Sequence, residues 1–252
     1  MFSRSEVLLG EAAMSRLRTA RVLVVGVGGV GSWCAEALVR TGVGHVTLVD
    51  DDVVAESNLN RQCPATAKTI GRPKVEAMAE RLREINPGCV VVPVCRRFAG
   101  WASFSSESSR SGIDLVVDAI DSVDCKAELI LGATEAGVSI VSSMGAALRL
   151  DPTKVKVTRF EKVEGDGLAR ALRQRFKRLQ RFPAAKFSCV WSTEPPVFLN
   201  TETRGHGENG EKSSVSPCLC VKTKGSLMPV TATFGMCLAS EAVRILTKGE
   251  QA

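Results

Sequence analysis

The chain has 252 residues, of which 44% are hydrophobic and 24% are charged, and its formal net charge is +6 at pH 7. This length accommodates one large α/β domain, or one domain with a modest insertion, and the composition excludes a fibrous or generally disordered protein. The net charge is modest, so the distribution of charge along the chain says more about partners than the sum does.

The first part of the chain alternates between strand and helix patterns. Residues 21–26, RVLVVG, form a valine-rich run that is typical of a strand covered on both faces of a parallel sheet. The pattern continues with a helix over 30–40, a strand over 46–50, a helix over 74–86 and a strand over 90–94. This order predicts a βαβαβ unit.

The alternation resumes after a serine-rich segment, 103–112, that we expect to be a surface loop. A strand over 114–120, a helix over 126–136 and a strand over 139–143 extend the predicted sheet. The sequence therefore predicts the α/β class, with a doubly wound, Rossmann-like sheet.

The character of the chain changes after Asp151-Pro152. A short strand over 155–160 is followed by a strongly basic helix over about 168–181, a strand-like segment over 187–193, an irregular segment over 194–226 and a last helix over 231–247. We predict two parts, a nucleotide-binding domain over 1–150 and a smaller C-terminal α+β extension over 151–252 that holds the basic helix and a mobile loop.

Three features bear on the compartment. The first 21 residues lack a continuous apolar core, so a secretory signal is not expected, whereas a weak organellar leader stays open. The apolar stretch 227–246 contains Pro229, Glu241 and Arg244, which favours a buried or dimer-facing helix over a membrane span. The nine cysteines, an odd number, lack paired CxxC spacings, and we expect a reduced, cytoplasmic protein.

Four glycines stand between the first strand and the first helix of the predicted sheet. They are Gly26, Gly28, Gly29 and Gly31. Backbone N–H groups in such a turn approach a phosphate closely, and Asp50 at the end of the next strand is typical of a carboxylate that binds ribose hydroxyls. On these residues alone, a dinucleotide such as NAD or FAD is favoured.

The segments that follow change this interpretation. Arg61, in SNLNRQ, and Lys74, in GRPK, supply positive charge that a bound dinucleotide does not need but that the cleavage of a triphosphate does. Asp121 follows the strand 114–120 at the carboxyl edge of the sheet, where a carboxylate can bind Mg²⁺. Together these residues predict AMP transfer from ATP.

The blocks GVGGVGSWCAEALVRTGVGHVTLVDDD, SNLNRQ, GRPKVEAMAERLREINP and DLVVDAIDS resemble, in order, the adenylation domain of the ubiquitin-activating superfamily. The resemblance is close over residues 9–147. The late segments FSCVWSTEPP and SLMPVTATFGM resemble the branch of that superfamily that cyclises N6-threonylcarbamoyladenosine at position 37 of tRNA. The resemblance therefore implies an ATP-dependent, AMP-forming dehydratase that acts on tRNA.

The resemblance also implies roles for individual residues. Arg61, Lys74 and Asp121 would be catalytic, with Asp121 on the magnesium. The nucleotide would contact the four glycines and Asp50, Asp52, Asn58, Gln62 and Ser122. Simpler interpretations stay open: Arg61 and Gln62 can be solvated loop residues, and Asp52 can merely solvate the loop after its strand.

The superfamily commonly supplies an arginine from the N-terminal segment of a partner subunit to the γ-phosphate, and the related dehydratases carry it near a position where this chain has a valine. Arg4 is the nearest candidate here. The resemblance implies a homodimer. It leaves open a requirement for a monovalent cation and the binding of a sulfur-transfer protein from a cysteine desulfurase system.

Two acceptors for the AMP group are compared. Superfamily members that activate the C-terminal glycine of a ubiquitin-like sulfur carrier usually hold zinc with two CxxC pairs, and this chain has only the tight pair Cys218-x-Cys220. The basic helix favours tRNA instead, because one side of it is cationic, with Arg170, Arg173, Lys177, Arg178 and Arg181, whereas Leu168, Leu172, Phe176 and Leu179 form the apolar side. Arg159, Lys162 and Lys186 extend the cationic side in this interpretation.

The basic helix and the Rossmann fold each permit a second interpretation. The helix can be an ordinary solvated surface, and a nucleotide-dependent redox or scaffold protein would share the fold without the adenylation chemistry. Cys189 has no histidine close in sequence that would activate it, so we expect a packing residue rather than a thioester-forming nucleophile. His45 is expected in a loop.

Overall fold

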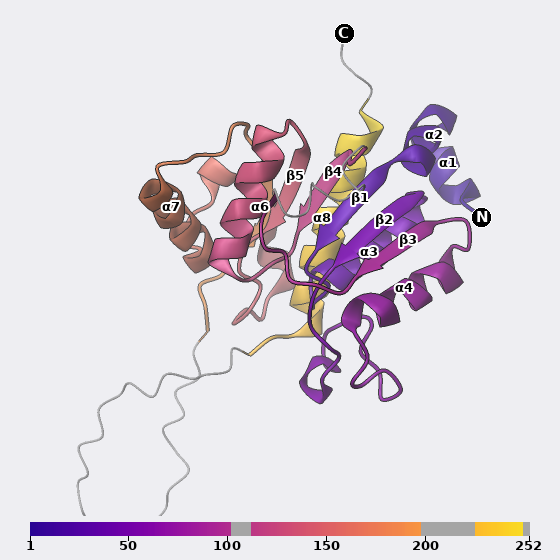
Figure 1. The fold of residues 1–252 in the computed structure, drawn as a ribbon, viewed down its shortest axis with the longest axis horizontal. Coiled ribbons are helices and arrows are strands. Elements are labelled where there is room, and N and C mark those ends of the chain that lie inside the picture. The colour runs from indigo at the N-terminus through magenta and orange to yellow at the C-terminus, as the bar shows by residue number, and fades with distance from the viewer. Residues whose placement is uncertain (102–111, 198–224, 249–252) are drawn as a thin grey trace, which may run out of the picture.

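The computed structural model describes residues 1–101, 112–197 and 225–248 (Figure 1). Its centre is one seven-stranded sheet with the strand order β3-β2-β1-β4-β5-β7-β6. All neighbouring strands are parallel except β6 and β7, which are antiparallel. The strands are β1 (Arg21–Val25), β2 (His45–Val49), β3 (Val90–Val94), β4 (Leu115–Asp118), β5 (Ser139–Ser143), β6 (Val155–Arg159) and β7 (Ser188–Ser192). The predicted doubly wound α/β class is confirmed.

The helices cover both faces of this sheet. They are α1 (Ser3–Leu9), α2 (Glu11–Thr19), α3 (Gly31–Thr41), α4 (Lys74–Ile85), α6 (Val123–Glu135), α7 (Gly167–Leu179) and α8 (Met228–Thr247). Short 3-10 turns lie at η1 (Glu56–Asn58), η2 (Pro152–Lys154) and η3 (Phe160–Lys162). Helix α8 begins three residues before the predicted start, because Pro229 is tolerated in a first helical turn, where its missing N–H has no partner to lose.

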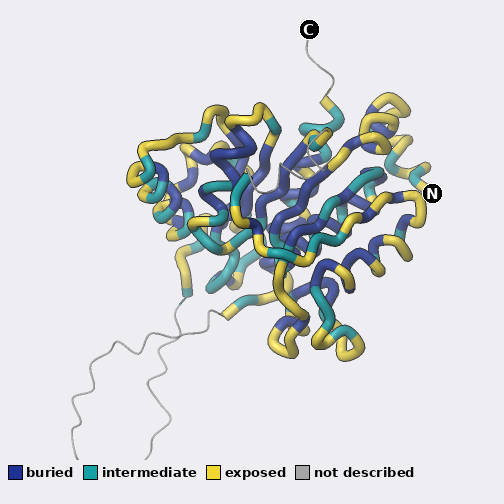
Figure 2. Tube along the Cα trace, in the orientation of Figure 1, coloured by how far each residue is buried: buried dark blue, intermediate teal, exposed yellow. Residues whose placement is uncertain are grey.

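Alternate residues along the central strands face two separate cores. On β1, Val22 and Val24 pack with apolar residues of α2, α3, α4 and α8. Leu23 and Val25 point the other way and pack with α6 and α7. In Figure 1, α6 lies in front of the sheet and α8 behind it, and Figure 2 shows the central strands as buried. The uninterrupted valine runs follow from burial on both faces.

Helix α8 lies inside the first core. A Cβ at Gly235 would come within 2.6 Å of the Val30 carbonyl oxygen, so glycine there permits close contact with α3. Among the described residues, α8 is the one helix that is long and apolar enough to cross a membrane, but its Phe234, Leu238 and Ala242 have no exposed surface. This burial agrees with the expectation of a core helix.

The residues after position 150 do not form a sheet of their own. Strand β7 pairs with β5 from Val141↔Ser188 to Ser143↔Val190, and β6 completes the edge beyond it. The predicted C-terminal extension is therefore continuous with the first part of the chain. Most of the predicted loops 103–112 and 194–226, including the Cys218-x-Cys220 pair, lies outside the described residues.

Two details differ from the sequence-based expectation. His45 begins β2, where its backbone N–H donates to the Ala20 carbonyl at 3.1 Å, so the prediction of a loop residue is wrong. Helices α1 and α2 were not predicted. Helix α1 has no buried residue, and α2 has three, Ala13, Met14 and Leu17. Because so few positions are buried, the sequence shows too little apolar periodicity to predict either helix.

Candidate functional site

The glycine turn between β1 and α3 fits closely against the residues after β4. Gly26 has φ of +91°, and a Cβ there would lie 2.7 Å from the Ala119 carbonyl oxygen. A Cβ at Gly31 would lie 1.8 Å from the Gly26 oxygen. Since neither space admits a side chain, these two glycines are required by the turn itself.

The other two glycines face predicted site residues. The nearest atom to a Cβ at Gly28 would be Nε2 of Gln62, at 3.9 Å, and the nearest to one at Gly29 would be Cγ of Arg61, at 3.3 Å. The structure therefore brings the glycine turn, Arg61 and Gln62 together, although they come from separate segments of the chain.

Asp50 fixes this turn from the end of β2. Its Oδ2 accepts from the Val27 N–H at 2.6 Å, and its Oδ1 accepts from the Asp52 N–H at 2.9 Å. Burial raises the pKa of Asp50, and the two backbone hydrogen bonds together with the charge of Lys74 oppose that rise. A carboxylate oxygen accepts more than one hydrogen bond, so each oxygen retains capacity for a ribose hydroxyl.

Lys74 begins α4 and is held by Asp52. Its Nζ lies 2.6 Å from Oδ2 of Asp52, and its backbone N–H donates to the Asp52 carbonyl at 3.0 Å. The lysine side chain is 7% exposed whereas that of Asp52 is 67% exposed. The ammonium is thus kept at the site by a solvated carboxylate, which a phosphate can displace as a partner.

The segment 55–63 contains three predicted nucleotide contacts with different surroundings. Asn58 is buried, and its Oδ1 accepts from the Ala55 N–H at 3.1 Å, so it stabilises the local turn. The Arg61 guanidinium donates to the Ser57 carbonyl at 2.9 Å. Gln62 is buried, and its Oε1 has no hydrogen-bond partner in the described part of the chain. A buried amide oxygen without a partner is costly, which is consistent with a ligand contact.

Asp121 and Ser122 follow β4, and Asp121 is exposed. Beneath them lies a buried network that the sequence patterns do not reveal. Nζ of Lys126 lies 2.8 Å from Oδ2 of Asp118 and donates to the Ile120 carbonyl at 2.9 Å. Ser142 Oγ donates to the same Asp118 oxygen at 2.6 Å. The network fixes the backbone immediately before Asp121.

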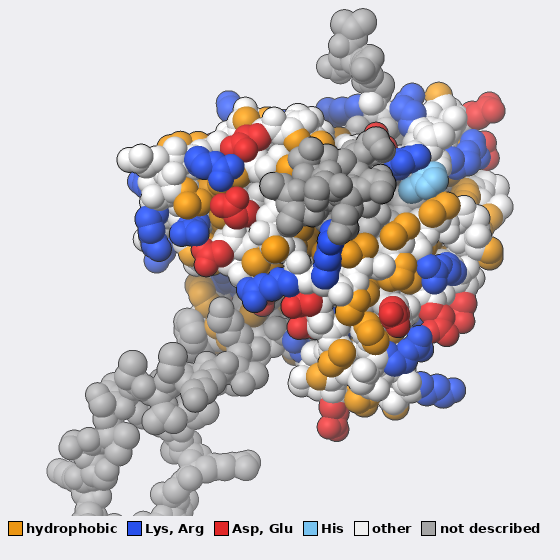
Figure 3. Space-filling model, in the orientation of Figure 1, with side chains coloured by type: hydrophobic (Ala, Val, Ile, Leu, Met, Phe, Trp, Pro, Cys, Tyr) orange, Lys and Arg blue, Asp and Glu red, His pale blue; other side chains and the backbone are white. Residues whose placement is uncertain are grey.

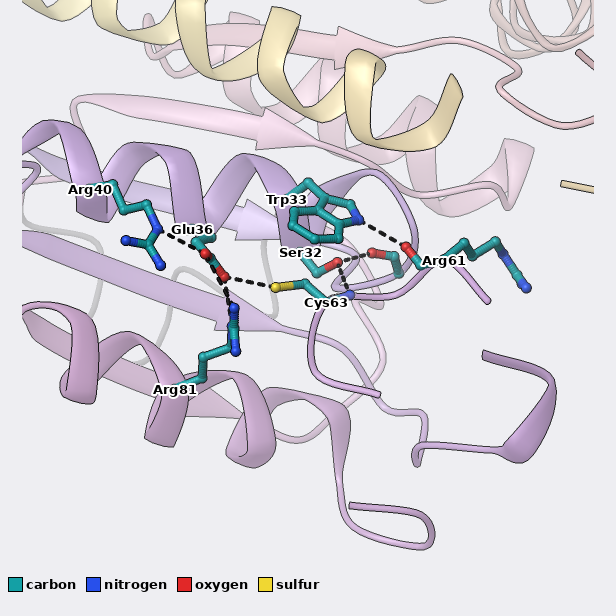
Figure 4. Close-up of polar contacts among 8 residues, drawn as sticks. Ser32, Trp33, Glu36, Arg40, Arg61, Cys63 and Arg81 are labelled. Carbon is teal, nitrogen blue, oxygen red and sulfur yellow. Dashed lines mark hydrogen bonds and ion pairs between the residues drawn. The ribbon is translucent and has the colours of Figure 1, made fainter. Parts of the chain in front are cut away.

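A second network connects three segments around the site (Figure 4). We call it the Glu36 cluster, and it consists of Glu36, Arg40, Cys63 and Arg81. The Glu36 carboxylate, 7% exposed, accepts from Nε of Arg40 at 2.8 Å, from Nε of Arg81 at 2.6 Å and from the Cys63 thiol at 2.8 Å. It therefore connects α3 with α4 and with the segment that carries Arg61.

The Glu36 cluster is charged at neutral pH. Burial alone would raise the pKa of Glu36, but hydrogen bonds from Arg81, Cys63 and Arg40 outweigh it and lower the pKa to about 2. Burial and the neighbouring carboxylate raise the pKa of Cys63 to about 12, so its thiol stays protonated and remains a donor. The Ser32 hydroxyl extends the connection, because it accepts from the Cys63 N–H at 3.1 Å and donates to the Gly28 carbonyl at 2.6 Å.

Helix α7 has the predicted apolar side, on which Ala169, Leu172 and Phe176 are buried. Of the five predicted cations, Arg170, Lys177, Arg178 and Arg181 are exposed. Arg181 also pairs with Glu135 at 3.0 Å and with Glu128 at 3.4 Å. In Figure 3, Lys and Arg side chains gather at the left edge, over α7, with acidic side chains beside them.

Arg173 corrects the prediction of one continuous outward-facing side. Its guanidinium donates to the carbonyls of Phe160 at 2.9 Å and of Val163 at 2.7 Å, and it lies 4.9 Å from the centre of the Phe160 ring. The helix turns this cation toward η3 because the carbonyls there need donors. Arg173 therefore fastens α7 to the protein.

Cys189 lies in β7 with no exposed surface, and burial raises the pKa of its thiol. A buried, protonated thiol packs well and reacts poorly, in agreement with the expected packing role.

Comparison with known proteins agrees with this geometry. The model of the ThiF family matches residues 2–252. The tRNA threonylcarbamoyladenosine dehydratase of Escherichia coli K12 is 38% identical over 250 residues, which are 96% of this chain and 92% of that protein. The enzyme of the same name from Haemophilus influenzae is 36% identical over 241 residues, covering 94% and 89%. The crystal structure of the E. coli enzyme in complex with ATP has a TM-score of 0.81 and 36% identity, covering 97% of this chain and 93% of that one.

Proposed function

The chain belongs to the ThiF family, and we propose that it is an ATP-using tRNA threonylcarbamoyladenosine dehydratase. The observation that carries the proposal is the extent of the similarity, which covers 96% of this chain and therefore includes the residues beyond position 150 as well as the glycine turn. The ATP complex of the similar E. coli enzyme supports the nucleotide.

The reaction begins with a carboxylate that is a poor electrophile. A carboxylate oxygen of threonylcarbamoyladenosine attacks the α-phosphorus of ATP, which forms an acyl-adenylate and releases pyrophosphate. The carbamoyl group then closes onto the activated carbonyl and AMP leaves, so that the tRNA nucleoside loses one water. Because the second step is intramolecular, the protein has mainly to hold the ring-forming geometry and to exclude water.

Residues around the glycine turn have different roles in the first step, the adenylation of the carboxylate. The turn and Asp50 hold the phosphates and the ribose. Arg61 and Lys74 stabilise the negative charge that develops as the α-phosphate is transferred, and Lys74 exchanges its Asp52 partner for phosphate oxygens. Gln62, with its unpartnered Oε1, and Ser122 complete the nucleotide contacts in this proposal. Asn58 acts indirectly, since its side-chain oxygen is already bonded to the backbone.

Asp121 fits a magnesium site. It is an exposed carboxylate that directly follows Ala119 and Ile120, against which Gly26 packs. Mg²⁺ in nucleotide sites commonly uses one or two carboxylates together with phosphate oxygens. Bound there, Mg²⁺ would neutralise charge on the phosphates. The Asp118 network would keep Asp121 in place, because Lys126 holds the preceding carbonyl.

Exposed cations on α7 supply the contact with tRNA. Arg170, Lys177 and Arg178 have no ion-pair partner within the described residues, so phosphate is a suitable partner for them. Arg173 is left out of this set because its donors are used by backbone carbonyls.

A second copy of the chain fits the face formed by α1, α3 and α8. Leu8, Leu9, Ala37, Met236 and Val243 line an open groove there, and Leu8 is 83% exposed. An exposed apolar groove of this kind favours self-association. Arg4 lies on the same α1 helix, and the superfamily resemblance implies that an arginine of this N-terminal segment reaches the partner's nucleotide in a homodimer.

The test is the reaction itself. The purified protein is incubated with ATP, Mg²⁺ and tRNA that carries threonylcarbamoyladenosine, and nucleosides are analysed by mass spectrometry. We expect a product lighter by one water, together with stoichiometric AMP and pyrophosphate. ATP–pyrophosphate exchange that requires a carrier protein ending in Gly-Gly, and ignores the tRNA, would instead identify a sulfur-carrier adenylyltransferase.

A further inference from the structure

The segment from α7 to β7 is cationic throughout. Residues 167–186 contain seven Lys or Arg residues and no Asp or Glu. Five of the seven are exposed, namely Arg170, Lys177, Arg178, Arg181 and Lys186. A surface of this charge attracts a polyanion more strongly than it attracts an ordinary protein surface.

One exposed aromatic ring lies within this cationic segment. Phe182 is 62% exposed, and no other Phe or Trp in the described residues is exposed. Its neighbours Phe176 and Phe187 are buried in the usual way, at 2% and 4%. A phenylalanine ring left in water forgoes the stabilisation of burial, which makes this position unusual among the described residues.

The backbone around Phe182 is held on both sides. Helix α7 ends at Leu179, and the next residue, Gln180, has a φ of +52° that turns the chain away from the helix axis. The Arg181 N–H donates to the Phe176 carbonyl at 3.2 Å, and the Ala184 N–H donates to Oγ1 of Thr134 at 3.2 Å. Because the chain is fixed before and after the ring, and Pro183 restricts its own φ, the ring is presented in a defined position.

The side chain of Arg181 adds to this rigidity. It reaches back to α6 and pairs with Glu135 and Glu128, so it holds the loop rather than contacting a partner. Lys177, Arg178 and Lys186 remain as exposed cations within five residues of Phe182 along the chain. We call these four residues, Lys177, Arg178, Phe182 and Lys186, the Phe182 surface.

The chemistry of this surface favours single-stranded RNA over protein. Residues 160–190 contain no other exposed large apolar side chain, so the apolar area is too small for the centre of a protein interface. A single exposed ring in a cationic segment matches a nucleotide instead, because the ring can stack on a base while nearby cations contact the flanking phosphates. Proteins recognise unpaired RNA bases in this manner.

From these observations we propose that Phe182 stacks on an unpaired base of a tRNA loop, with Lys177, Arg178 and Lys186 on the adjacent phosphates. The inference rests on the proposed function, because it assigns to tRNA a contact outside the adenylation site. It predicts that part of the tRNA affinity depends on one aromatic ring rather than on charge alone.

The test measures binding of the full chain to tRNA that carries threonylcarbamoyladenosine, by fluorescence anisotropy, for Phe182→Ala, Phe182→Leu and Phe182→Trp. Base stacking contributes about 1–3 kcal/mol, so Phe182→Ala is expected to raise the Kd by on the order of tenfold. Phe182→Leu retains apolar area without an aromatic face and should lose most of that affinity, whereas Phe182→Trp should retain it. The Kd for ATP should not change in any variant.

Val92→Ala is the matched control, since Val92 is also an exposed apolar residue, at 45%, but lies on β3 at the opposite edge of the sheet. Its tRNA affinity should equal that of the unsubstituted chain. A tRNA with 2-aminopurine in the anticodon loop provides a second readout, because stacking on Phe182 should quench its fluorescence and Phe182→Leu should abolish that quenching.

The outcomes separate two failures. If the unsubstituted chain does not bind tRNA, the proposed function itself fails. If it binds and Phe182→Ala binds equally well, only the stacking inference is overturned. Affinity retained in Phe182→Leu would also overturn the stacking inference. Unchanged tRNA binding by Phe182→Ala, together with altered self-association in sedimentation, would overturn it too and would identify Phe182 as a protein contact.

Discussion

The carboxylate of Asp118 and the ammonium of Lys126 form an ion pair at 2.8 Å, and neither side chain has any exposed surface. Charges buried to this degree lose their hydration, so the pair persists only because its members satisfy each other and their neighbours. Lys126 also donates to the Ile120 carbonyl, which is next to Asp121. The pair thus links the stability of the core to the position of a proposed magnesium ligand.

We expect Lys126→Met to lower the free energy of unfolding by roughly 3–5 kcal/mol, because it leaves the Asp118 carboxylate buried without its counter-ion. Urea unfolding followed by circular dichroism measures the change. The double variant Asp118→Leu with Lys126→Met should recover most of the loss, since apolar residues can replace a buried pair. Arg181→Met removes two exposed ion pairs, with Glu135 and Glu128, and should cost no more than about 1 kcal/mol. A similarly small cost for Lys126→Met would contradict the expectation.

Glu36 is expected to act as a positioning residue, through Arg61 and Lys74. Glu36→Gln keeps the shape of the side chain but weakens its bonds to Arg81, Arg40 and Cys63. We expect kcat for ATP–pyrophosphate exchange to fall by on the order of tenfold, because small displacements of the two cations weaken transition-state stabilisation more than ground-state binding. The KM for ATP should change much less. Assays are made at a temperature where circular dichroism shows the variant fully folded.

Glu80→Gln is the control for this prediction. Glu80 is on α4 and pairs with Arg72 at 2.6 Å, but its side chain is 56% exposed. The same chemical change there should leave both kcat and KM unaltered. Equal losses in the two variants, or a loss confined to stability in Glu36→Gln, would show that Glu36 has no positioning role.

The low pKa of Glu36 predicts a pH dependence of stability. Its pKa is about 2 in the folded protein against an ordinary value of 4.5. A lowered folded-state pKa means that the stabilisation is complete above about pH 5 and is lost as the pH falls toward 2. The free energy of unfolding of the unsubstituted chain should therefore decline more steeply over this range than that of Glu36→Gln, as urea titrations at a series of pH values would measure. Parallel curves would contradict this assignment.

Lys74→Ala and Asp121→Ala should each reduce AMP formation at least about a hundredfold, since loss of one group that stabilises developing charge commonly costs that much. Neither should change the fold greatly, because Asp52, the partner of Lys74, is 67% exposed and Asp121 is exposed. Release of AMP and pyrophosphate from ATP in the presence of modified tRNA measures the effect. Glu84→Ala, which removes an exposed carboxylate on α4, serves as the control and should retain activity.

The sequence was sufficient to predict those parts of the site that are formed by consecutive elements of the chain. The glycine turn and Asp50 could be predicted because a strand, a turn and a second strand determine where they meet. The Glu36 cluster could not, since Glu36, Cys63 and Arg81 come from three segments and only the packing of α3 against α4 brings them together. Arg173 shows a related limit, because helical spacing predicted an outward-facing cation and could not reveal the carbonyls of Phe160 and Val163 that it meets.

Lys177 and Arg173 lie in different surroundings, so the same substitution to Glu is expected to affect tRNA binding at Lys177 and stability at Arg173. Lys177→Glu removes an exposed cation, so it should weaken tRNA binding and reduce the slope of log K against log salt by about 1, with the melting temperature unchanged. Arg173→Glu removes the donor to the Phe160 and Val163 carbonyls and should lower the melting temperature instead. Anisotropy titrations at several salt concentrations and thermal melting of both variants make the comparison. If Arg173→Glu were as stable as the unsubstituted chain, Arg173 would not fasten α7 to the protein. If Lys177→Glu bound tRNA normally, Lys177 would not contact tRNA.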